Sequence, residues 1–217
     1  MNFIYYLLLF YVLGIILFIT RKYDLFTIAI IYGMSGIFLW FGKIPMFIFL
    51  LSYFCLAEGI TIILKNKKEK RSYINLLGNC LVGTVLIVFG QIYASASTIC
   101  AAFADTFSSE IGRVSKVKPR LITNFKEVEP GTNGGITILG LLGALFVSAF
   151  TFALFYFIFK TDFKIAIIIA SFGMLGTIID SFIGAILENK GYTDNSQTNF
   201  LTTLIIGGIS LLVFSLI

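Results

Sequence analysis

Residues 73–112 read YINLLGNCLVGTVLIVFGQIYASASTICAAFADTFSSEIG, and this uninterrupted run decides how the chain divides into helices. It contains no basic residue and only two acidic ones, Asp105 and Glu110. Its length is twice the ~20 residues that one helix needs to cross a bilayer. We therefore expect two membrane helices here, with their boundary near the polar segment GQIYASAS at residues 90–97.

The rest of the chain is similarly apolar. Of its 217 residues, 58% are hydrophobic and 12% are charged, and the mean hydropathy is +0.98. Soluble domains carry about 25% charged residues, so this composition indicates an integral membrane protein. We predict a single transmembrane domain over 1–217, with N-terminal helices in 1–94 and a motif-bearing part in 95–217. The absence of histidine excludes histidine-based acid–base catalysis.

Apolar runs of bilayer length predict an all-α, polytopic protein with about eight transmembrane helices, seven to nine being compatible with the sequence. The predicted spans are 2–20, 25–41, 44–64, 73–93, 95–112, 135–159, 165–188 and 199–217. The boundary between the fourth and fifth spans is the least defined, because no charged residue marks it.

Basic residues predict the orientation. If the N-terminus lies outside, thirteen of the 16 basic residues fall in inside loops, as the positive-inside rule requires. These loops are 21–24, 65–72, 113–134 and 189–198, and only Lys43, Lys160 and Lys164 lie outside. We therefore expect a plasma-membrane protein whose loops 113–134 and 189–198 face the cytoplasm. Any chemistry on soluble metabolites is expected at that face, and no nucleic-acid partner is expected.

Five acidic residues fall within or beside the predicted spans: Glu58, Asp105, Glu110, Asp180 and Glu188. An ionisable group in a bilayer costs about 2.5–3.5 kcal/mol on insertion scales and indicates function. Asp105 and Asp180 are both expected roughly 10–12 Å below cytoplasmic helix ends. Two carboxylates at one depth, together with substrate phosphates, suit Mg²⁺, and we predict a metal site at this pair. Glu58 has no predicted role beyond snorkelling toward the interface.

The sequences after the two aspartates are similar. DTFSSEI at Asp105 and DSFIGAI at Asp180 indicate either a parallel repeat with a site between its halves, or a chance similarity among apolar residues. Ser108, Ser109 and Gly112 share a helical face with Asp105. For the serines and glycines alone, helix–helix packing is the favoured interpretation.

The basic loop supplies a candidate phosphate site. Lys126 precedes the segment PGTNGG at residues 130–135, which we expect to open a helix near Ile136, and such a turn offers backbone N–H groups to phosphate. The positive-inside rule is an alternative explanation of the basic residues. The predicted nucleotide-binding residues are Ser109, Arg113, Lys126, Gly131, Thr132, Gly134, Gly135, Asp194, Asn195 and Asn199. A plain helix N-cap is an equal alternative for Asp194.

Four blocks of sequence follow in order: DTFSSEIGR from Asp105, KEVEPGTNGG from Lys126, DSFIGA from Asp180 and TDNSQTN from Thr193. Over residues 95–217 they resemble a family of small integral membrane proteins that includes the plant phytyl-phosphate kinase of the tocopherol pathway. More remotely, the acidic helix and the glycine-rich loop are similar to the CTP-dependent dolichol and polyprenol kinases and the phosphatidate cytidylyltransferases.

The resemblance implies an enzyme that uses a nucleoside triphosphate, with CTP as the expected nucleotide, together with Mg²⁺ and a lipid acceptor. The expected reaction is phosphorylation of an isoprenyl monophosphate, of phytyl or geranylgeranyl type, to the diphosphate. Asp105, Asp180 and Lys126 would then be the catalytic residues. Two alternatives stay open: cytidylyl transfer to a lipid phosphate, and a small ion-coupled transporter. A homodimer is compatible with either class.

Overall fold

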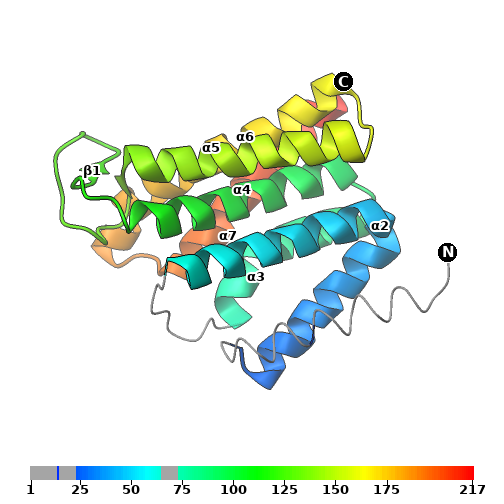
Figure 1. Ribbon diagram of the computed structural model, residues 1–217, viewed down its shortest axis with the longest axis horizontal. Coiled ribbons are helices and arrows are strands. Elements are labelled where there is room, and N and C mark those ends of the chain that lie inside the picture. The colour runs from blue at the N-terminus through cyan, green and yellow to red at the C-terminus, as the bar shows by residue number, and fades with distance from the viewer. Residues whose placement is uncertain (1–13, 15–22, 65–72) are drawn as a thin grey trace.

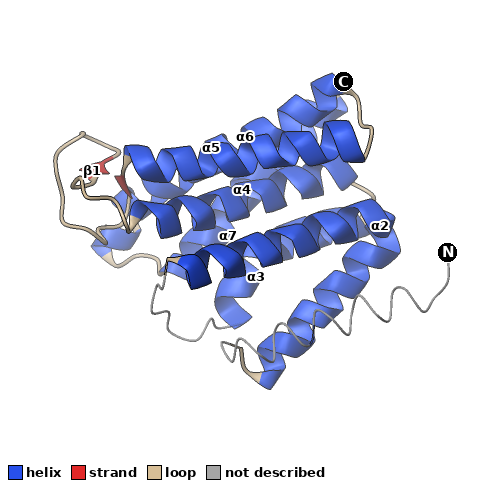
Figure 2. Ribbon diagram, in the orientation of Figure 1, coloured by secondary structure: helices blue, strands red, loops and turns tan. Residues whose placement is uncertain are grey.

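Helices form most of the described chain, which comprises residue 14, residues 23–64 and residues 73–217 of this computed structural model (Figure 2). The long helices are α2 (Leu25–Ile63), α3 (Tyr73–Val88), α4 (Ile92–Gly112), α5 (Ile138–Ala153), α6 (Phe163–Ile186) and α7 (Asn195–Ser215). The short elements are β1 (Arg120–Leu121), β2 (Gly135–Ile136), the π-helical turn η1 (Leu154–Ile158) and the 3₁₀ turn η2 (Glu188–Lys190). The predicted span 2–20 lies outside the described residues, apart from Gly14.

Four helices in the described part of the chain are long and apolar enough to cross a membrane. They are Leu25–Thr61, Ile138–Ile158, Phe163–Lys190 and Asn195–Ser215, while Tyr73–Val88 is apolar but shorter. The all-α class and the membrane character are therefore confirmed. The total of eight spans and the orientation of the N-terminus stay predictions.

Helix α2 is bent sharply at the position where the sequence predicts a break between spans 25–41 and 44–64. Lys43 has φ 59° and ψ −165°, which interrupts the helical backbone, and Pro45 follows two residues later. At 1.5 Å per residue, 39 helical residues would extend about 58 Å, roughly twice the ~30 Å hydrocarbon thickness of a bilayer. The bend instead turns the second half back along the bundle (Figure 1).

The boundary between α3 and α4 differs from the prediction. The turn covers only residues 89–91, where Gly90 adopts a positive φ of 76°, and α4 already begins at Ile92. The serines near the predicted boundary are helical, and their hydroxyls donate to backbone carbonyls: Ser95 to Gly83 at 2.7 Å and Ser97 to Tyr93 at 2.9 Å. Internal hydrogen bonding therefore makes this polar segment compatible with a buried helix.

Helix α4 occupies the centre of the bundle and contacts α2, α3, α5, α6 and α7 (Figure 1). Small residues permit this close packing. A Cβ atom at Gly176 of α6 would lie 2.3 Å from the Cβ of Ala101, and one at Gly173 would lie 2.9 Å from the Sγ of Cys100. Membrane helices commonly approach through such small residues, since lipid provides no hydrophobic force to press them together.

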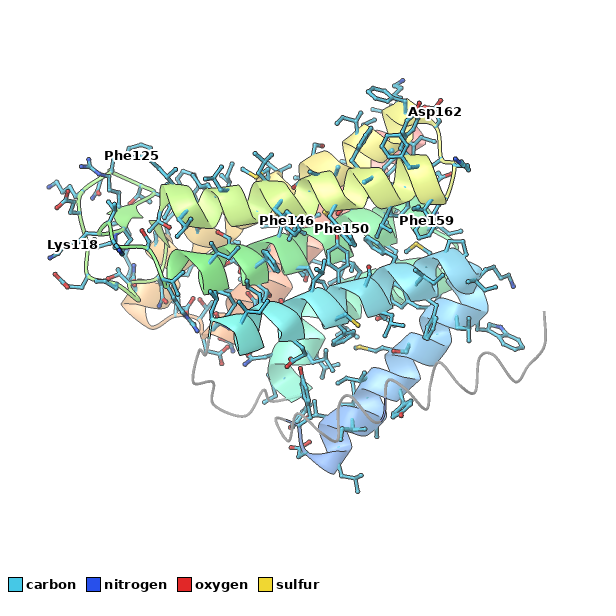
Figure 3. The ribbon with its side chains drawn as sticks, viewed as in Figure 1. Lys118, Phe125, Phe146, Phe150, Phe159 and Asp162 are labelled. Atoms are coloured by element: carbon cyan, nitrogen blue, oxygen red, sulfur yellow. The ribbon has the colours of Figure 1, made fainter. Side chains whose placement is uncertain are left out.

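The two ends of the bundle differ in their number of basic residues. The end of α4, the start of α5, the end of α6 and the start of α7 lie together at the end that carries Lys118 and Phe125, and Asp162 lies at the opposite end (Figure 3). We call the first end the basic end. Its described basic residues are Arg113, Lys116, Lys118, Arg120, Lys126 and Lys190. Those at the other end are Lys43, Lys160 and Lys164. The structure thus gathers loops 113–134 and 189–198 at one end, as the charge pattern predicts.

Two predicted helix starts are wrong by a few residues. The glycine-rich segment does not open a helix near Ile136, because Gly135 and Ile136 pair with β1 as a short antiparallel strand. Helix α5 begins at Ile138 with Thr137 as its N-cap, whose hydroxyl accepts a hydrogen bond from the N–H of Gly140 at 3.0 Å. Helix α7 begins at Asn195, four residues before the predicted 199.

Candidate functional site

Asp105 and Asp180 lie on neighbouring helices at matching depth. Ala101 of α4 packs against Gly176 of α6, and each aspartate follows four residues later on helices that run in the same direction. Both side chains are half-buried. The small-residue contact between α4 and α6 brings the two helices together at this level. The pairing of the two carboxylates as a metal site stays a prediction.

Helix α7 adds hydroxyl groups to this carboxylate pair. The Oγ1 atom of Thr202 donates to Oδ2 of Asp180 at 2.9 Å, and Thr198 lies one helical turn earlier on the same face of α7. The half-buried Glu188 follows Asp180 on the same chain segment, just beyond the end of α6. We call Asp105, Asp180 and Glu188, with Thr198 and Thr202, the carboxylate cluster.

Three members of the carboxylate cluster were missed as site residues in the sequence. Glu188 is the last residue of the predicted span 165–188. A carboxylate at the end of a span lies at the membrane interface and does not by itself indicate a site. Thr198 and Thr202 are four residues apart, which places them on one helical face, and this spacing was the available signal.

The residues predicted from the TDNSQTN block divide between two roles. Asp194 is the N-cap of α7: its Oδ1 accepts from the N–H of Gln197 at 2.9 Å, and the Gln197 side chain accepts from the N–H of Asp194 at 3.0 Å. Asn195 is exposed in the first turn. Asn199 is only 8% exposed and lies between Thr198 and Thr202 in sequence. The capping alternative is thus confirmed for Asp194, whereas Asn199 faces the interior of the bundle.

At the end of α4, Ser108 and Gly112 pack against α5, whereas Ser109 is exposed. Gly112 and Ser108 face α5, since a Cβ at Gly112 would lie 3.3 Å from the Oγ1 of Thr137 and one at Gly140 would lie 3.1 Å from the Oγ of Ser108. This supports the packing interpretation for those two residues. Ser109 is exposed, one helical turn beyond Asp105 toward the basic end.

The glycine-rich loop packs directly on α6. A Cβ at Gly134 would lie 2.5 Å from the carbonyl oxygen of Ser181 and 2.7 Å from the backbone N of Ala185. The Nδ2 of Asn189 donates to the carbonyl of Asn133 at 2.9 Å, which fastens the loop to the end of α6. Because Ser181 directly follows Asp180, the turn lies against the same segment of α6 that carries this aspartate. Substitution of Gly134 by valine would therefore disturb folding as well as any phosphate contact.

Three of the basic residues in loop 113–134 are already paired. Arg113 lies 3.6 Å from the buried carboxylate of Glu110, Lys118 lies 2.8 Å from Glu129, and Arg120 lies 3.2 Å from Glu127. The hydrogen bond and charge of Glu129 raise the pKa of Lys118 above its ordinary value.

Lys126 has an exposed side chain, and among the described residues it forms no ion pair. Its backbone is fixed, since its N–H donates to Oδ1 of Asn124 at 3.0 Å and its carbonyl accepts from the N–H of Leu121 at 2.9 Å. No described contact joins Lys126 to the carboxylate cluster. Its side chain extends from an ordered turn into the space beyond the loop, and is available to an anion.

The donor set of the carboxylate cluster fits Mg²⁺ only in part. Over residues 23–64 and 73–217, no three acidic or cysteine side chains converge closely enough to hold a metal ion by themselves. Mg²⁺ is commonly held by one or two carboxylates, with substrate phosphates and water completing its shell. Asp105 and Asp180 satisfy that requirement, whereas a closed, protein-only metal site does not fit.

Glu58 is not a snorkelling residue, and this expectation is wrong. Its side chain lies in α2 with 5% exposure, and the hydroxyl of Tyr23 donates to its Oε1 at 2.5 Å. A buried carboxylate needs a polar partner, and Tyr23 supplies one inside the bundle.

Comparison with known proteins agrees with this architecture. The uncharacterized membrane protein MJ0933 of Methanocaldococcus jannaschii is 39% identical over 194 residues, covering 83% of this chain and 81% of the relative. Protein PGR of Arabidopsis thaliana is 41% identical over 100 residues, covering 41% of this chain and 34% of PGR. The chloroplastic protein VTE6 of the same plant is 26% identical over 146 residues, covering 62% of this chain and 43% of VTE6.

No solved structure shows significant similarity to the chain. A family model matches residues 8–207, which include α2 to α6, the part of α7 up to residue 207 and the whole of the carboxylate cluster. The chain is a member of the integral membrane protein family DUF92.

Proposed function

We propose that the chain is a membrane-embedded kinase that transfers the terminal phosphoryl group of a nucleoside triphosphate to an isoprenyl monophosphate. The products are the isoprenyl diphosphate and a nucleoside diphosphate. CTP is the expected nucleotide, on the resemblance to CTP-dependent lipid kinases. The observation that carries the proposal is the pairing of Asp105 and Asp180 on adjacent helices, at the end of the bundle where the basic loop lies.

Phosphoryl transfer asks little covalent chemistry of a protein, and depends on positioning and on neutralising phosphate charge. Asp105 and Asp180 would hold Mg²⁺, which when bound neutralises charge on the transferring group. Thr202 orients Asp180 through its 2.9 Å hydrogen bond. Lys126 and the Gly131–Gly135 turn bind nucleotide phosphates, and Asn199 contributes a buried amide to the pocket.

Two observations support this reaction class over transport. Transporter sites lie near the middle of the bilayer, commonly at broken helices. Here the two aspartates stand two turns from the end of α4 and of α6, and both helices are continuous around them. The proposal also places the reaction at the cytoplasmic face of the plasma membrane, because the basic residues gather at that end.

The proposal is tested with purified protein in lipid nanodiscs, a panel of phytyl and geranylgeranyl monophosphates, and each of the four common nucleoside triphosphates with Mg²⁺. Mass spectrometry is expected to detect the isoprenyl diphosphate and a nucleoside diphosphate in equal amounts. A nucleotidyl-lipid with released pyrophosphate would instead support cytidylyl transfer. Absence of either product across the panel would contradict both.

The aspartate pair provides the matching variants. Asp105→Asn and Asp180→Asn preserve size and hydrogen bonding but remove charge, so each should lower turnover by a factor of about 100 or more. Because both act on one ion, the double variant should lose little beyond either single variant. Asp162→Asn at the opposite end is the control, since asparagine is an equally good helix cap there. Near-normal turnover in either cluster variant would disprove the two-aspartate site.

A further inference from the structure

An open groove of about 480 Å³ runs along the outer surface of the bundle between α3 and α7. Ile74, Leu77 and Leu81 of α3 line one side of it, and Phe200 and Leu201 of α7 line the other. Its volume falls in the range of small-molecule sites, about 300–1,000 Å³. The groove lies outside the carboxylate cluster, which is on the opposite face of α7.

The polarity of the groove changes along its length. Thr193, Ser196 and Gln197 line it at the start of α7, at the basic end of the bundle, whereas Leu81 and Leu201 lie deeper and are apolar. The Oγ of Ser196 is hydrogen-bonded to Oδ1 of Asn75, which joins α7 to α3 at that rim. A groove with a polar rim and an apolar depth matches a molecule that has a polar head and a hydrocarbon chain.

The rim is joined to the carboxylate cluster around the first turn of α7. The hydroxyl of Thr193 lies 3.1 Å from that of Thr198, and Thr198 lies one helical turn before Thr202, which donates to Asp180. Two hydroxyl groups therefore connect the rim of the groove with the residues proposed to act on phosphate. The groove and the cluster therefore meet at the same end of α7, although they lie on opposite faces of that helix.

We infer that the α3–α7 groove binds the head-proximal hydrocarbon of the isoprenyl phosphate substrate. This inference rests on the proposed function and adds the location of its lipid substrate. From Ile74 to Leu81 the helix rises about 10 Å, a third of the ~30 Å hydrocarbon thickness. The groove therefore contacts only the part of the chain next to the phosphate, and the remainder lies among bilayer lipids.

Photo-cross-linking tests the inference without requiring turnover. The probe is a geranylgeranyl monophosphate with a diazirine on its first isoprene unit, added to the full chain in phosphatidylcholine nanodiscs. Labels are expected on peptides that carry Leu77, Leu81 or Phe200, and unlabelled geranylgeranyl phosphate should remove them while added phosphatidylcholine does not. Labels that are absent, or that no isoprenyl phosphate displaces, would overturn the inference.

Two tryptophan variants provide a matched comparison. Leu81→Trp fills the depth of the groove, and should lower specific labelling at least fivefold and raise the KM for the lipid without changing nucleotide affinity. Leu142→Trp is the control, because Leu142 is 54% exposed on α5, which packs on α4 and α6 away from the groove. Wild-type labelling of Leu81→Trp would also overturn the inference. Specific labelling without any phosphorylated product would contradict the proposed kinase reaction alone.

Discussion

Lys126 is distinguished from its neighbours by what surrounds its charge. Lys118 and Arg120 of the same loop already meet Glu129 and Glu127, so a phosphate would have to compete with those carboxylates for them. Lys126 is held by its backbone in an ordered turn, while its side chain is exposed. A side chain whose backbone is fixed and whose charged end is exposed is well arranged to bind an anion.

We therefore predict that Lys126→Ala weakens nucleotide binding about tenfold or more, because hydrogen bonds to charged groups contribute about 1.5–3 kcal/mol. Titration calorimetry of the purified protein with a non-hydrolysable nucleotide measures the change. Lys118→Ala is the matched control and should alter affinity less than twofold. Equal effects of the two substitutions would mean that the loop acts through its total charge and not through Lys126.

At the residue scale, the sequence was sufficient for the carboxylates and insufficient for their partners. Asp105 and Asp180 are conspicuous because charge is rare in apolar helices. Thr202 and Thr198 are not conspicuous, since threonine is common in membrane helices and its partner depends on which helix packs beside it. The capping role of Asp194 was available from the spacing to Gln197, which is that of a capping box.

At the scale of elements, the glycine-rich loop is a structural connection between loop and helix. Gly131 and Gly134 both have positive φ, 94° and 74°, yet only Gly134 touches α6. A Cβ at Gly131 would meet nothing within 4 Å, whereas at Gly134 it would meet the α6 backbone. The two positions thus separate the conformational requirement for glycine from the packing requirement.

This difference predicts unequal losses of stability. Gly131→Ala and Gly134→Ala each place a side chain at positive φ, at a cost of about 1–2 kcal/mol. Gly134→Ala should lose about 1–3 kcal/mol more, because the α6 backbone must move to admit the Cβ. Thermal unfolding in detergent should give a lower midpoint for Gly134→Ala than for Gly131→Ala. Matching midpoints would show that the loop is not pressed against α6 in solution.

Element boundaries were less accessible from sequence than the elements themselves. The break in α2 was predicted correctly, because Lys43 and Pro45 interrupt two apolar runs. The start of α5 was misplaced, since Gly135 and Ile136 pair with Leu121 and Arg120 of β1, which are too distant in sequence to leave a local pattern. The α3–α4 turn, at residues 89–91, comes earlier than the predicted boundary between spans 73–93 and 95–112. The serines drew the predicted boundary toward themselves because serine is polar, while in the folded helix the hydroxyls of Ser95 and Ser97 are hydrogen-bonded internally.

At the scale of the whole molecule, the basic residues are distributed unequally between the two ends of the bundle. The predicted topology places Lys118 inside the cell and Lys164 outside, and both side chains are exposed at opposite ends of the structure. In a background that lacks Cys55, Cys80 and Cys100, a membrane-impermeant thiol reagent applied to intact cells should label Lys164→Cys and spare Lys118→Cys. Permeabilised cells, in which both should react, are the control. Labelling of Lys118→Cys from outside would reverse the topology and remove the cytoplasmic nucleotide from the proposed reaction.

The central position of α4 has a consequence for how the protein is made. Synthesis proceeds from the N-terminus, so α4 leaves the ribosome before α5, α6 and α7, three of the helices that later enclose it. Among the described residues, α4 is not one of the helices that are long and apolar enough to cross a membrane. It also carries Asp105 and Glu110. When α4 has been synthesised, three of the helices that pack against it have not yet been made. We therefore expect stable insertion of α4 to depend on segments translated after it, so that the polar residues proposed for chemistry also delay its assembly in the membrane.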